Sequence, residues 1–133
     1  MGNTYSDKLK PGLIYVIDHT VSEKDTALYF GSGGLDVLAT PALLAYMEQA
    51  SFLAIEKYLP AEYSTVGISI HMEHIGAAIK GEQFECKAEL IEIDDKKFIL
   101  SIVANNKKRK LATAKHIRYL IHKQDFMNRL NDR

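Results

Sequence analysis

The chain has 133 residues, of which 47% are hydrophobic and 26% are charged, a composition typical of a globular protein rather than a disordered one. Its 17 basic and 17 acidic side chains give a formal net charge of zero, which argues against a general nucleic-acid binder, because such proteins use a basic face to displace counterions. A single cysteine, Cys86, excludes an internal disulfide and a thiolate metal cluster, and no run of about twenty apolar residues is present to span a membrane. We therefore expect one domain over residues 1–133, located in the cytoplasm.

The first predicted elements are a strand and a glycine-rich loop. Residues 13–20 (LIYVIDHT) are rich in β-branched and aromatic side chains, which favour a strand. Residues 29–36 (YFGSGGLD) contain three glycines and predict a mobile loop that leads toward the next element.

The strongest helix signal follows this loop. Thr40 precedes Pro41, which is the pattern of an N-cap residue ahead of a proline at the first helical position. Apolar residues then continue until Pro60, which marks the end of the predicted helix. These apolar residues are Leu43, Leu44, Met47, Phe52, Ile55 and Leu59.

After Pro60 the hydrophobic pattern changes to a period of two. In the segment 65–75 (TVGISIHMEHI), Val66, Ile68, Ile70 and Met72 alternate with Gly67, Ser69, His71 and Glu73. Further strands are predicted over 83–93, 97–104 and 111–122, and a short helix over 124–130.

The order of elements is strand, loop, one long apolar helix, and four consecutive strands. Consecutive strands with short connections form antiparallel sheets, and a helix that is apolar almost all round must be buried on most sides. This combination predicts an α+β hotdog fold, in which a curved antiparallel sheet wraps around one long central helix. By analogy with that fold, a second subunit is expected to cover what the sheet leaves exposed.

Glu48 is the most informative polar residue of the predicted helix. Its neighbours one turn away include Leu44 and Phe52, so its carboxylate is expected either to lie in a cleft or to be paired. A buried carboxylate there would be suited to act as a general base or acid. Alternatively, Glu48 belongs to a polar strip together with Gln49 and Glu56.

Thr40 also has two interpretations. A threonine before a proline at a helix start caps the amides of the first turn, which is sufficient reason for its presence. The same amides attract developing negative charge, and a hydroxyl at that position could contact an acyl group. The residues alone leave both interpretations open.

His74 continues the even-numbered apolar series of its strand, so its ring is predicted to face the helix. It is either a hydrogen-bonded core histidine or a partner of Glu48. The alternation places His71 and Glu73 on the opposite face, so His71 and His74 are not expected to share a metal ion.

Two further features have a structural and a chemical interpretation. Cys86 lies on a predicted strand without an obvious base partner, and we expect it in the core rather than as a nucleophile. The basic run 107–110 (KKRK) lies in a predicted turn. It is expected to be either a solvated hairpin or a contact for the phosphates of a ligand such as coenzyme A.

Together these residues resemble the family of fluoroacetyl-CoA thioesterase, whose members are dimeric hotdog-fold enzymes that hydrolyse short acyl-CoA thioesters. The resemblance covers residues 13–126. It is carried by Ala39-Thr40, by Met47, Glu48 and Ala50, by Gly67, by the H-x-x-A that begins at His74, and by the final strand His116–His122.

The resemblance implies a function and a set of site residues. Thr40, Glu48 and His74 would take the catalytic positions, whereas Gly67 and Arg118 would bind the substrate. An acyl-CoA substrate and a homodimer are implied, with no nucleic acid, membrane or metal. No cofactor is expected apart from the coenzyme A of the substrate itself.

The sequence also departs from this family in one segment, and its spacing bears on how the site is assembled. The fluoroacetate-specific member carries phenylalanines just before the catalytic threonine, whereas residues 31–35 here are GSGGL, so a fluoroacetyl preference is not expected. Thr40 and Glu48 are about 12 Å apart along a helix, which favours a site completed by a second subunit. The alternatives are a non-catalytic acyl-CoA-binding protein and, less favoured, a dehydratase on the same fold.

Overall fold

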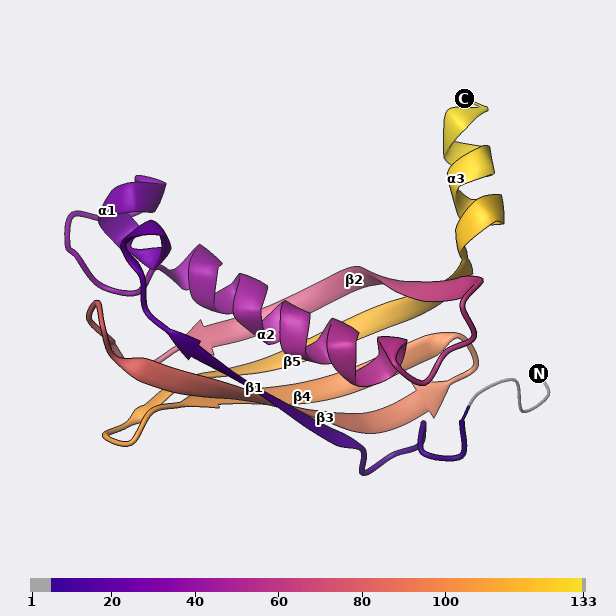
Figure 1. Ribbon diagram of the computed structural model, residues 1–133, viewed down its shortest axis with the longest axis horizontal. Coiled ribbons are helices and arrows are strands. Elements are labelled where there is room, and N and C mark those ends of the chain that lie inside the picture. The colour runs from indigo at the N-terminus through magenta and orange to yellow at the C-terminus, as the bar shows by residue number, and fades with distance from the viewer. Residues whose placement is uncertain (1–5, 133) are drawn as a thin grey trace.

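The structure is a computed structural model that describes residues 6–132. One long helix lies against a curved sheet of five strands (Figure 1). In chain order the elements are β1 (Ile14–Thr20), a 3-10 turn (Glu23–Asp25), α1 (Ala27–Phe30), α2 (Thr40–Glu56), β2 (Tyr63–His74), β3 (Gln83–Asp94), β4 (Lys97–Asn105), β5 (Lys110–His122) and α3 (Lys123–Asn131).

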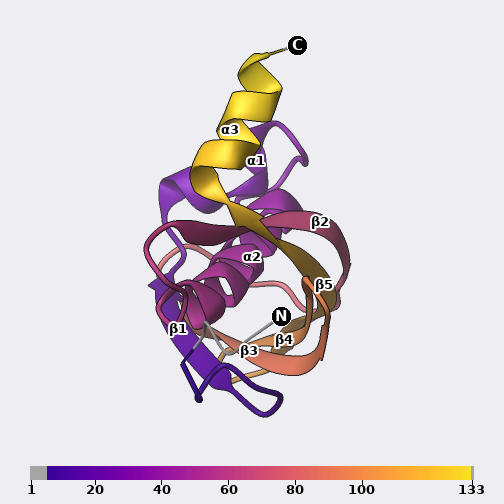
Figure 2. The same cartoon turned by 90° about the vertical axis from the view of Figure 1, so that its right-hand side faces the viewer.

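The five strands form one antiparallel sheet in the order β1-β3-β4-β5-β2. Viewed end-on, the sheet curls around α2, which occupies its concave side (Figure 2). This arrangement confirms the predicted α+β hotdog fold. Strands β1 and β2 are the two edges of the sheet, so each has one side without a neighbouring strand among residues 6–132.

The core lies between α2 and the concave face of the sheet. Leu43, Met47 and Ile55 of α2 are fully buried in one cluster with alternate residues of β3 and β4. Burial alternates strictly along β4, as expected for a strand with one face on the core. These strand residues are Phe84, Cys86, Ala88, Leu90, Phe98, Leu100, Ile102 and Ala104.

The segment predicted as a loop over 29–36 is partly helical. Tyr29 and Phe30 belong to α1, whose N-cap Thr26 accepts a hydrogen bond from the Tyr29 amide. Gly31 ends this helix with φ 74°, a left-handed conformation that favours glycine. The prediction was therefore wrong at residues 29–30. The glycines suggested a loop, whereas Thr26, which lies before them, caps a short helix that includes these two residues.

Residues 25–27 and 37–39, which flank this segment, are hydrogen-bonded to each other, and we call them the loop base. The Ala27 amide donates to the Val37 carbonyl at 2.8 Å, and the Ala39 amide donates to the Asp25 carbonyl at 2.8 Å. The Leu38 amide donates to the carbonyl of Ala78, beyond the end of β2, at 2.8 Å. The loop base therefore holds the backbone immediately before α2.

A β-bulge interrupts β2 at Ile68. Gly67 pairs with Arg118 and Ser69 pairs with Ile117, so Ile68 is the extra residue without a cross-strand partner. The bulge reverses the alternation: Ile68 is 51% exposed, although the pattern predicted it in the core. As a result, Gly67 faces the same side of the sheet as Ile70, Met72 and His74, which follow the bulge.

The last helix, α3, projects from the end of β5 away from the sheet (Figure 1), and none of its residues is buried. The short helix predicted over 124–130 is thus confirmed. Among residues 6–132, each helix is too short or too polar to cross a membrane.

Candidate active site

Thr40 and His74 are joined by a hydrogen bond between α2 and β2. The Oγ1 atom of Thr40 lies 2.8 Å from Nδ1 of His74, the last residue of β2. The other ring nitrogen of His74, Nε2, is buried and has no hydrogen-bond partner among the described residues. His74 therefore faces the helix, as the alternation predicted, and one of its two nitrogens is engaged by a hydroxyl.

The capping interpretation of Thr40 is wrong. Thr40 is already the first residue of α2, and the N-cap is Ala39, whose side chain makes no capping bond. Ala39 has extended backbone angles (φ −74°, ψ 142°), and its carbonyl accepts the Leu43 amide at 3.0 Å. Because the loop base fixes Ala39, the helix begins one residue earlier than predicted and the threonine hydroxyl is directed at the imidazole instead.

Glu48 is paired rather than buried. Its Oε2 atom lies 3.4 Å from Nη1 of Arg118 and 3.9 Å from Nε2 of His116, and its side chain is 43% exposed in the single chain. Of the two sequence-based expectations, a buried cleft and a paired carboxylate, the structure shows the second. The contact to a fixed cation orients the carboxylate while solvent still reaches it.

Gly67 lies directly under the Glu48 carboxylate. A Cβ atom at position 67 would come within 2.7 Å of Glu48 Oε2 and 3.1 Å of His116 Cε1. The bulge at Ile68 produces this approach, because strict alternation would place Gly67 and His74 on opposite faces of the strand. Glycine is thus the residue that leaves room for the carboxylate in its present position.

Arg118 is a buried cation held on three sides. Its Nε atom donates to Thr65 Oγ1 at 2.7 Å, and Nη2 donates to the Thr65 carbonyl at 2.9 Å. Its guanidinium lies over the Phe52 ring, 5.4 Å from the centroid, and Nη1 faces Glu48. Burial lowers the pKa of Arg118, and the neighbouring Glu48 opposes that shift. Arginine nonetheless stays protonated in proteins.

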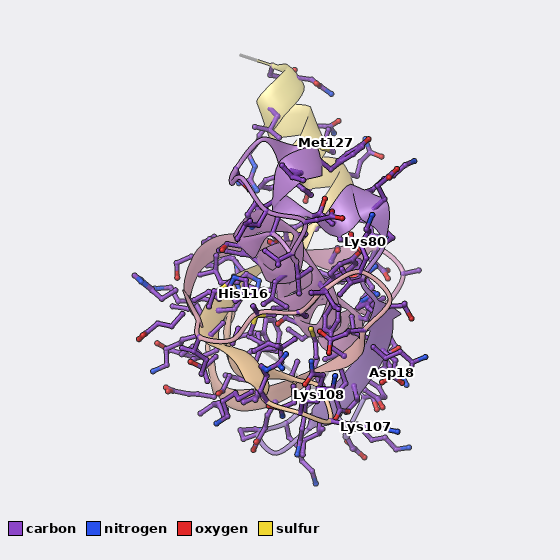
Figure 3. All side chains as sticks on the ribbon, turned by 90° about the vertical axis from the view of Figure 1, so that its left-hand side faces the viewer. Asp18, Lys80, Lys107, Lys108, His116 and Met127 are labelled. Atoms are coloured by element: carbon purple, nitrogen blue, oxygen red, sulfur yellow. The ribbon has the colours of Figure 1, made fainter. Side chains whose placement is uncertain are left out.

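Sequence reasoning did not single out His116, which is buried beside Arg118. Figure 3 places it inside the curve of the sheet. Burial, assisted by the Arg118 charge, lowers the pKa of His116, against the opposing effects of the Ser69 carbonyl and Glu48. The available signal was the i, i+2 spacing of His116 and Arg118, which puts both side chains on one face of a strand.

The structure brings these residues together as two groups rather than one. Thr40 contacts His74, whereas Glu48 contacts Arg118 and lies over Gly67. On β5 the partners of His74 and Gly67 are six residues apart, which is about 20 Å of strand. Cavities of about 570, 660 and 400 Å³ open elsewhere on the described chain, and those three are lined by other residues.

A second polar cluster lies on the β1 side of α2. The Asp25 carboxylate accepts hydrogen bonds from the Ser22 amide (2.9 Å), the Ser22 hydroxyl (3.0 Å) and the Tyr46 hydroxyl (2.6 Å). Burial raises the pKa of Asp25, but the bonds from Tyr46 and Ser22 outweigh it, so this pKa lies below its ordinary value. Burial and the Asp25 contact raise the pKa of Tyr46 to about 12. The Tyr46 ring stacks on His19 of β1, with ring centroids 3.8 Å apart.

The remaining sequence-based candidates lie outside both groups. Cys86 is fully buried and burial raises its thiol pKa to about 12, so it is a core residue, as predicted. The basic run 107–110 lies at the turn between β4 and β5. Lys108 and Arg109 of this turn approach the Glu82 carboxylate at 3.6 and 3.8 Å, and Arg109 donates to the Ala77 carbonyl at 2.7 Å.

Comparison with known proteins identifies the family and the fold. The family model described as fluoroacetyl-CoA-specific thioesterase matches residues 21–124, whereas the curated proteins contain no match to the chain. A variant of the fluoroacetyl-CoA-specific thioesterase FlK is 21% identical with a TM-score of 0.88, over 96% of this chain and 98% of that one. Another FlK variant, solved in complex with acetyl-CoA, is 20% identical with a TM-score of 0.86, over 93% of this chain and 98% of that one.

A hot-dog-like protein from Thermanaerovibrio acidaminovorans is also similar, with 18% identity and a TM-score of 0.87 over 95% of this chain and 93% of that one. At these identities the structural likeness establishes the fold. The family match spans most of the sequence, including Thr40, Glu48, Gly67, His74 and Arg118. The chain therefore belongs to the fluoroacetyl-CoA-specific thioesterase family and is a thioester hydrolase with the hotdog fold.

Proposed function

We propose that the protein hydrolyses acyl-CoA thioesters with a short or small acyl group, using Thr40, Glu48 and His74 at or near a dimer interface. The observation that carries this proposal is the 2.8 Å hydrogen bond between Thr40 and His74. A hydroxyl bonded to an imidazole is the arrangement in which the imidazole can take the hydroxyl proton.

The reaction requires an oxygen nucleophile, a base and donors for the oxyanion. Overall, a bond forms between a water oxygen and the thioester carbonyl carbon, the C–S bond breaks, and the thiolate of coenzyme A takes up a proton. The Thr40 hydroxyl either attacks the carbonyl to form an acyl-enzyme or positions the attacking water. In both versions His74 and Glu48 handle the proton, and backbone amides near the start of α2 or Gly67 polarise the carbonyl.

The surroundings of Gly67 support a small acyl group. The Glu48 carboxylate takes up the space that the missing side chain leaves, and the nearby buried groups are Arg118 and His116, so the surroundings are polar. A long alkyl chain would displace solvent from these charged groups without offering them a hydrogen bond, which is costly. An acyl group of a few carbons avoids that cost.

Coenzyme A, as part of the substrate, accounts for the basic turn at 107–110, and we propose no other cofactor. His74 pairs with Ala112 on β5, and Lys110 lies two residues further toward the turn, about 7 Å along the strand. The turn is thus at the same end of the sheet as the Thr40–His74 pair. Its exposed lysines are suited to contact the phosphates of a bound coenzyme A.

A homodimer is the second part of the proposal. Strand β2 is a 12-residue edge strand, and long open edges favour pairing with another chain. Ile68 and Ile75 are exposed on or next to this edge, and Nε2 of His74 has no partner within the described chain. A second copy would cover the apolar residues. The active site would then combine the Thr40–His74 pair of one copy with Glu48 of the other, because these groups lie about 20 Å apart within one chain.

One experiment tests the activity and its alternative together. The protein is incubated with acetyl-, propionyl-, hexanoyl- and palmitoyl-CoA and a thiol reagent, and thiol release is followed. Release that is fastest for the short chains supports the proposal. Thermal stabilisation by acyl-CoA without thiol release would instead identify a non-catalytic binding protein. Size-exclusion chromatography with light scattering determines whether the active species is a dimer.

A further inference from the structure

His116 is buried next to the site, yet the proposed reaction gives it no task. Its side chain is 1% exposed and lies on β5, opposite Ile70 of β2. Its Nδ1 atom is 2.8 Å from the Ser69 carbonyl, directly after the bulge, and its Nε2 atom is 3.1 Å from Nη1 of Arg118. The imidazole thus connects the bulged part of β2 to the cation that pairs with Glu48.

The two partners of His116 determine its protonation. A carbonyl oxygen can only accept, so Nδ1 must carry a proton, whereas an arginine nitrogen can only donate, so Nε2 must be free to accept. A second proton, on Nε2, would face the Arg118 guanidinium and replace an attraction by a repulsion. Both contacts are satisfied together by the neutral ring with its proton on Nδ1.

The same contacts determine where Arg118 points. Nε and Nη2 of Arg118 are bound to Thr65, so Nη1 is the part of the guanidinium that faces Glu48 and Gly67. Nη1 is shared between a rigid acceptor, His116, and a half-exposed one, Glu48. Removal of the rigid acceptor leaves a buried donor without its partner, which weakens the fixed orientation of Nη1 toward Glu48.

We propose that His116 is a positioning residue, which acts as a neutral acceptor and fixes the Arg118 guanidinium so that Nη1 orients the Glu48 carboxylate over Gly67. This inference rests on the proposed thioesterase function, because its kinetic consequence is a misplaced Glu48. It goes beyond that function in giving His116 an effect on turnover without any contact to the substrate.

Two substitutions separate the two hydrogen bonds of His116. In His116→Asn the side-chain amide reaches the position of Nδ1 and retains a donor for Ser69 but no acceptor for Arg118. In His116→Gln the longer side chain reaches the position of Nε2 and retains an acceptor for Arg118 but no donor for Ser69. Each variant loses one bond, so each serves as the stability control of the other in thermal unfolding.

The expected result is a lower kcat on acetyl-CoA for His116→Asn, by about tenfold, because a hydrogen bond to a charged group is lost. KM is expected to change by less than about threefold, and His116→Gln is expected to recover most of kcat. Equal kcat values for the two variants, or a higher value for His116→Asn, would overturn the positioning role and leave His116 as a support of the bulge.

A measurement on the unmodified protein does not depend on the variants folding. Long-range ¹H–¹⁵N correlation spectra of histidine-labelled protein are expected to show the His116 ring neutral, with its proton on Nδ1. A ring protonated on Nε2 would overturn the inference.

If the unmodified protein releases no thiol from any acyl-CoA, the proposed function fails and the positioning role fails with it. An active enzyme with two equivalent variants instead rejects the positioning role alone.

Discussion

Two carboxylates lie on opposite sides of α2, and their surroundings differ. Asp25, on the β1 side, is 7% exposed and accepts three hydrogen bonds, from Ser22 and Tyr46. Glu48, on the β2 side, is half-exposed and has only long contacts, 3.4 Å to Arg118 and 3.9 Å to His116. The first carboxylate has its hydrogen-bonding capacity largely used within the chain, whereas the second keeps acceptor capacity for another group.

This difference separates a carboxylate that is bound within the chain from one that we propose acts on the substrate. The bonds to Asp25 join the turn before α1 to α2 and secure the loop base, so their effect belongs to stability. The cation beside Glu48 orients the carboxylate without enclosing it, so that interaction is suited to chemistry. The substitutions below test whether this division is correct.

The largest effect is expected for Glu48→Gln and for His74→Ala. Each removes a group proposed to move a proton, and a positioned acid or base contributes at least about a hundredfold to the rate. Turnover of acetyl- or propionyl-CoA is therefore expected to fall by about a hundredfold, with little change in thermal stability. The measurement is thiol release under saturating substrate. Unchanged turnover in both variants would exclude both residues from the mechanism.

Gly67→Ala is expected to have the next largest effect. Its new methyl group would occupy the position 2.7 Å from Glu48 Oε2, and the half-exposed carboxylate would move away from Arg118. A loss of kcat of about tenfold is expected. Stability should fall as well, because the methyl group would also lie 3.1 Å from the buried His116 ring. Gly34→Ala is the matched control, since a Cβ at Gly34 meets open space. An equal response of the two glycine variants would contradict this account of Gly67.

Asp25→Asn and Tyr46→Phe are expected to lower the stability of the protein and to leave its turnover nearly unchanged, in contrast to the substitutions of Glu48 and His74. Tyr46→Phe removes one hydrogen bond and should lower the free energy of unfolding by about 1 kcal/mol. Because the folded pKa of Asp25 lies below its ordinary value, its stabilisation is present above about pH 3.9 and is lost as the pH falls through the folded pKa. The free energies of unfolding of the unmodified protein and of Asp25→Asn, measured in urea, should therefore differ most near neutral pH and become equal in acid. A difference that grows in acid would contradict a stabilising role of the Asp25 carboxylate.

The smallest effect is expected at the basic turn. Replacement of both Lys107 and Lys110 by glutamate should raise KM for acetyl-CoA by about threefold, because exposed charge pairs contribute weakly. The same variant should treat acetyl-pantetheine, which lacks the phosphates, like the unmodified protein. A matching rise in KM for both substrates would show that the turn does not contact the phosphates.

The regular parts of the fold were predictable from the sequence. Alternation marks all of β4 and β3 as far as Leu90, where the register shifts. The Asp94-Asp95 turn between them has Asp95 in the left-handed conformation (φ 56°) that aspartate tolerates. The long apolar helix bounded by prolines was also predicted, although α2 ends at Glu56, before the last apolar residue of the pattern. These features depend on local periodicity, which a sequence displays directly.

The parts that the sequence did not reveal depend on contacts between distant residues. The bulge at Ile68 is one extra residue in β2 and leaves no trace in a hydrophobic pattern, yet it turns Gly67 toward Glu48. The N-cap at Ala39 depends on its bond to Asp25, and the role of His116 depends on the register of β2 against β5. The resemblance implied one site with Thr40, Glu48 and His74, and the pattern offered Glu48 as a partner of His74. Within the chain, His74 instead contacts Thr40 at 2.8 Å, and Glu48 contacts Arg118.

The hydrogen bonds within the loop base make the exposed residues that it encloses tolerant of sequence changes. The stretch 31–36 is exposed and tethered at both ends by bonds that do not involve its own tip. Residues could be inserted or deleted there, or a longer hairpin grafted, while the start of α2 stays in register. Such changes would leave the Thr40–His74 contact in place, because the bonds of the loop base lie outside the altered residues.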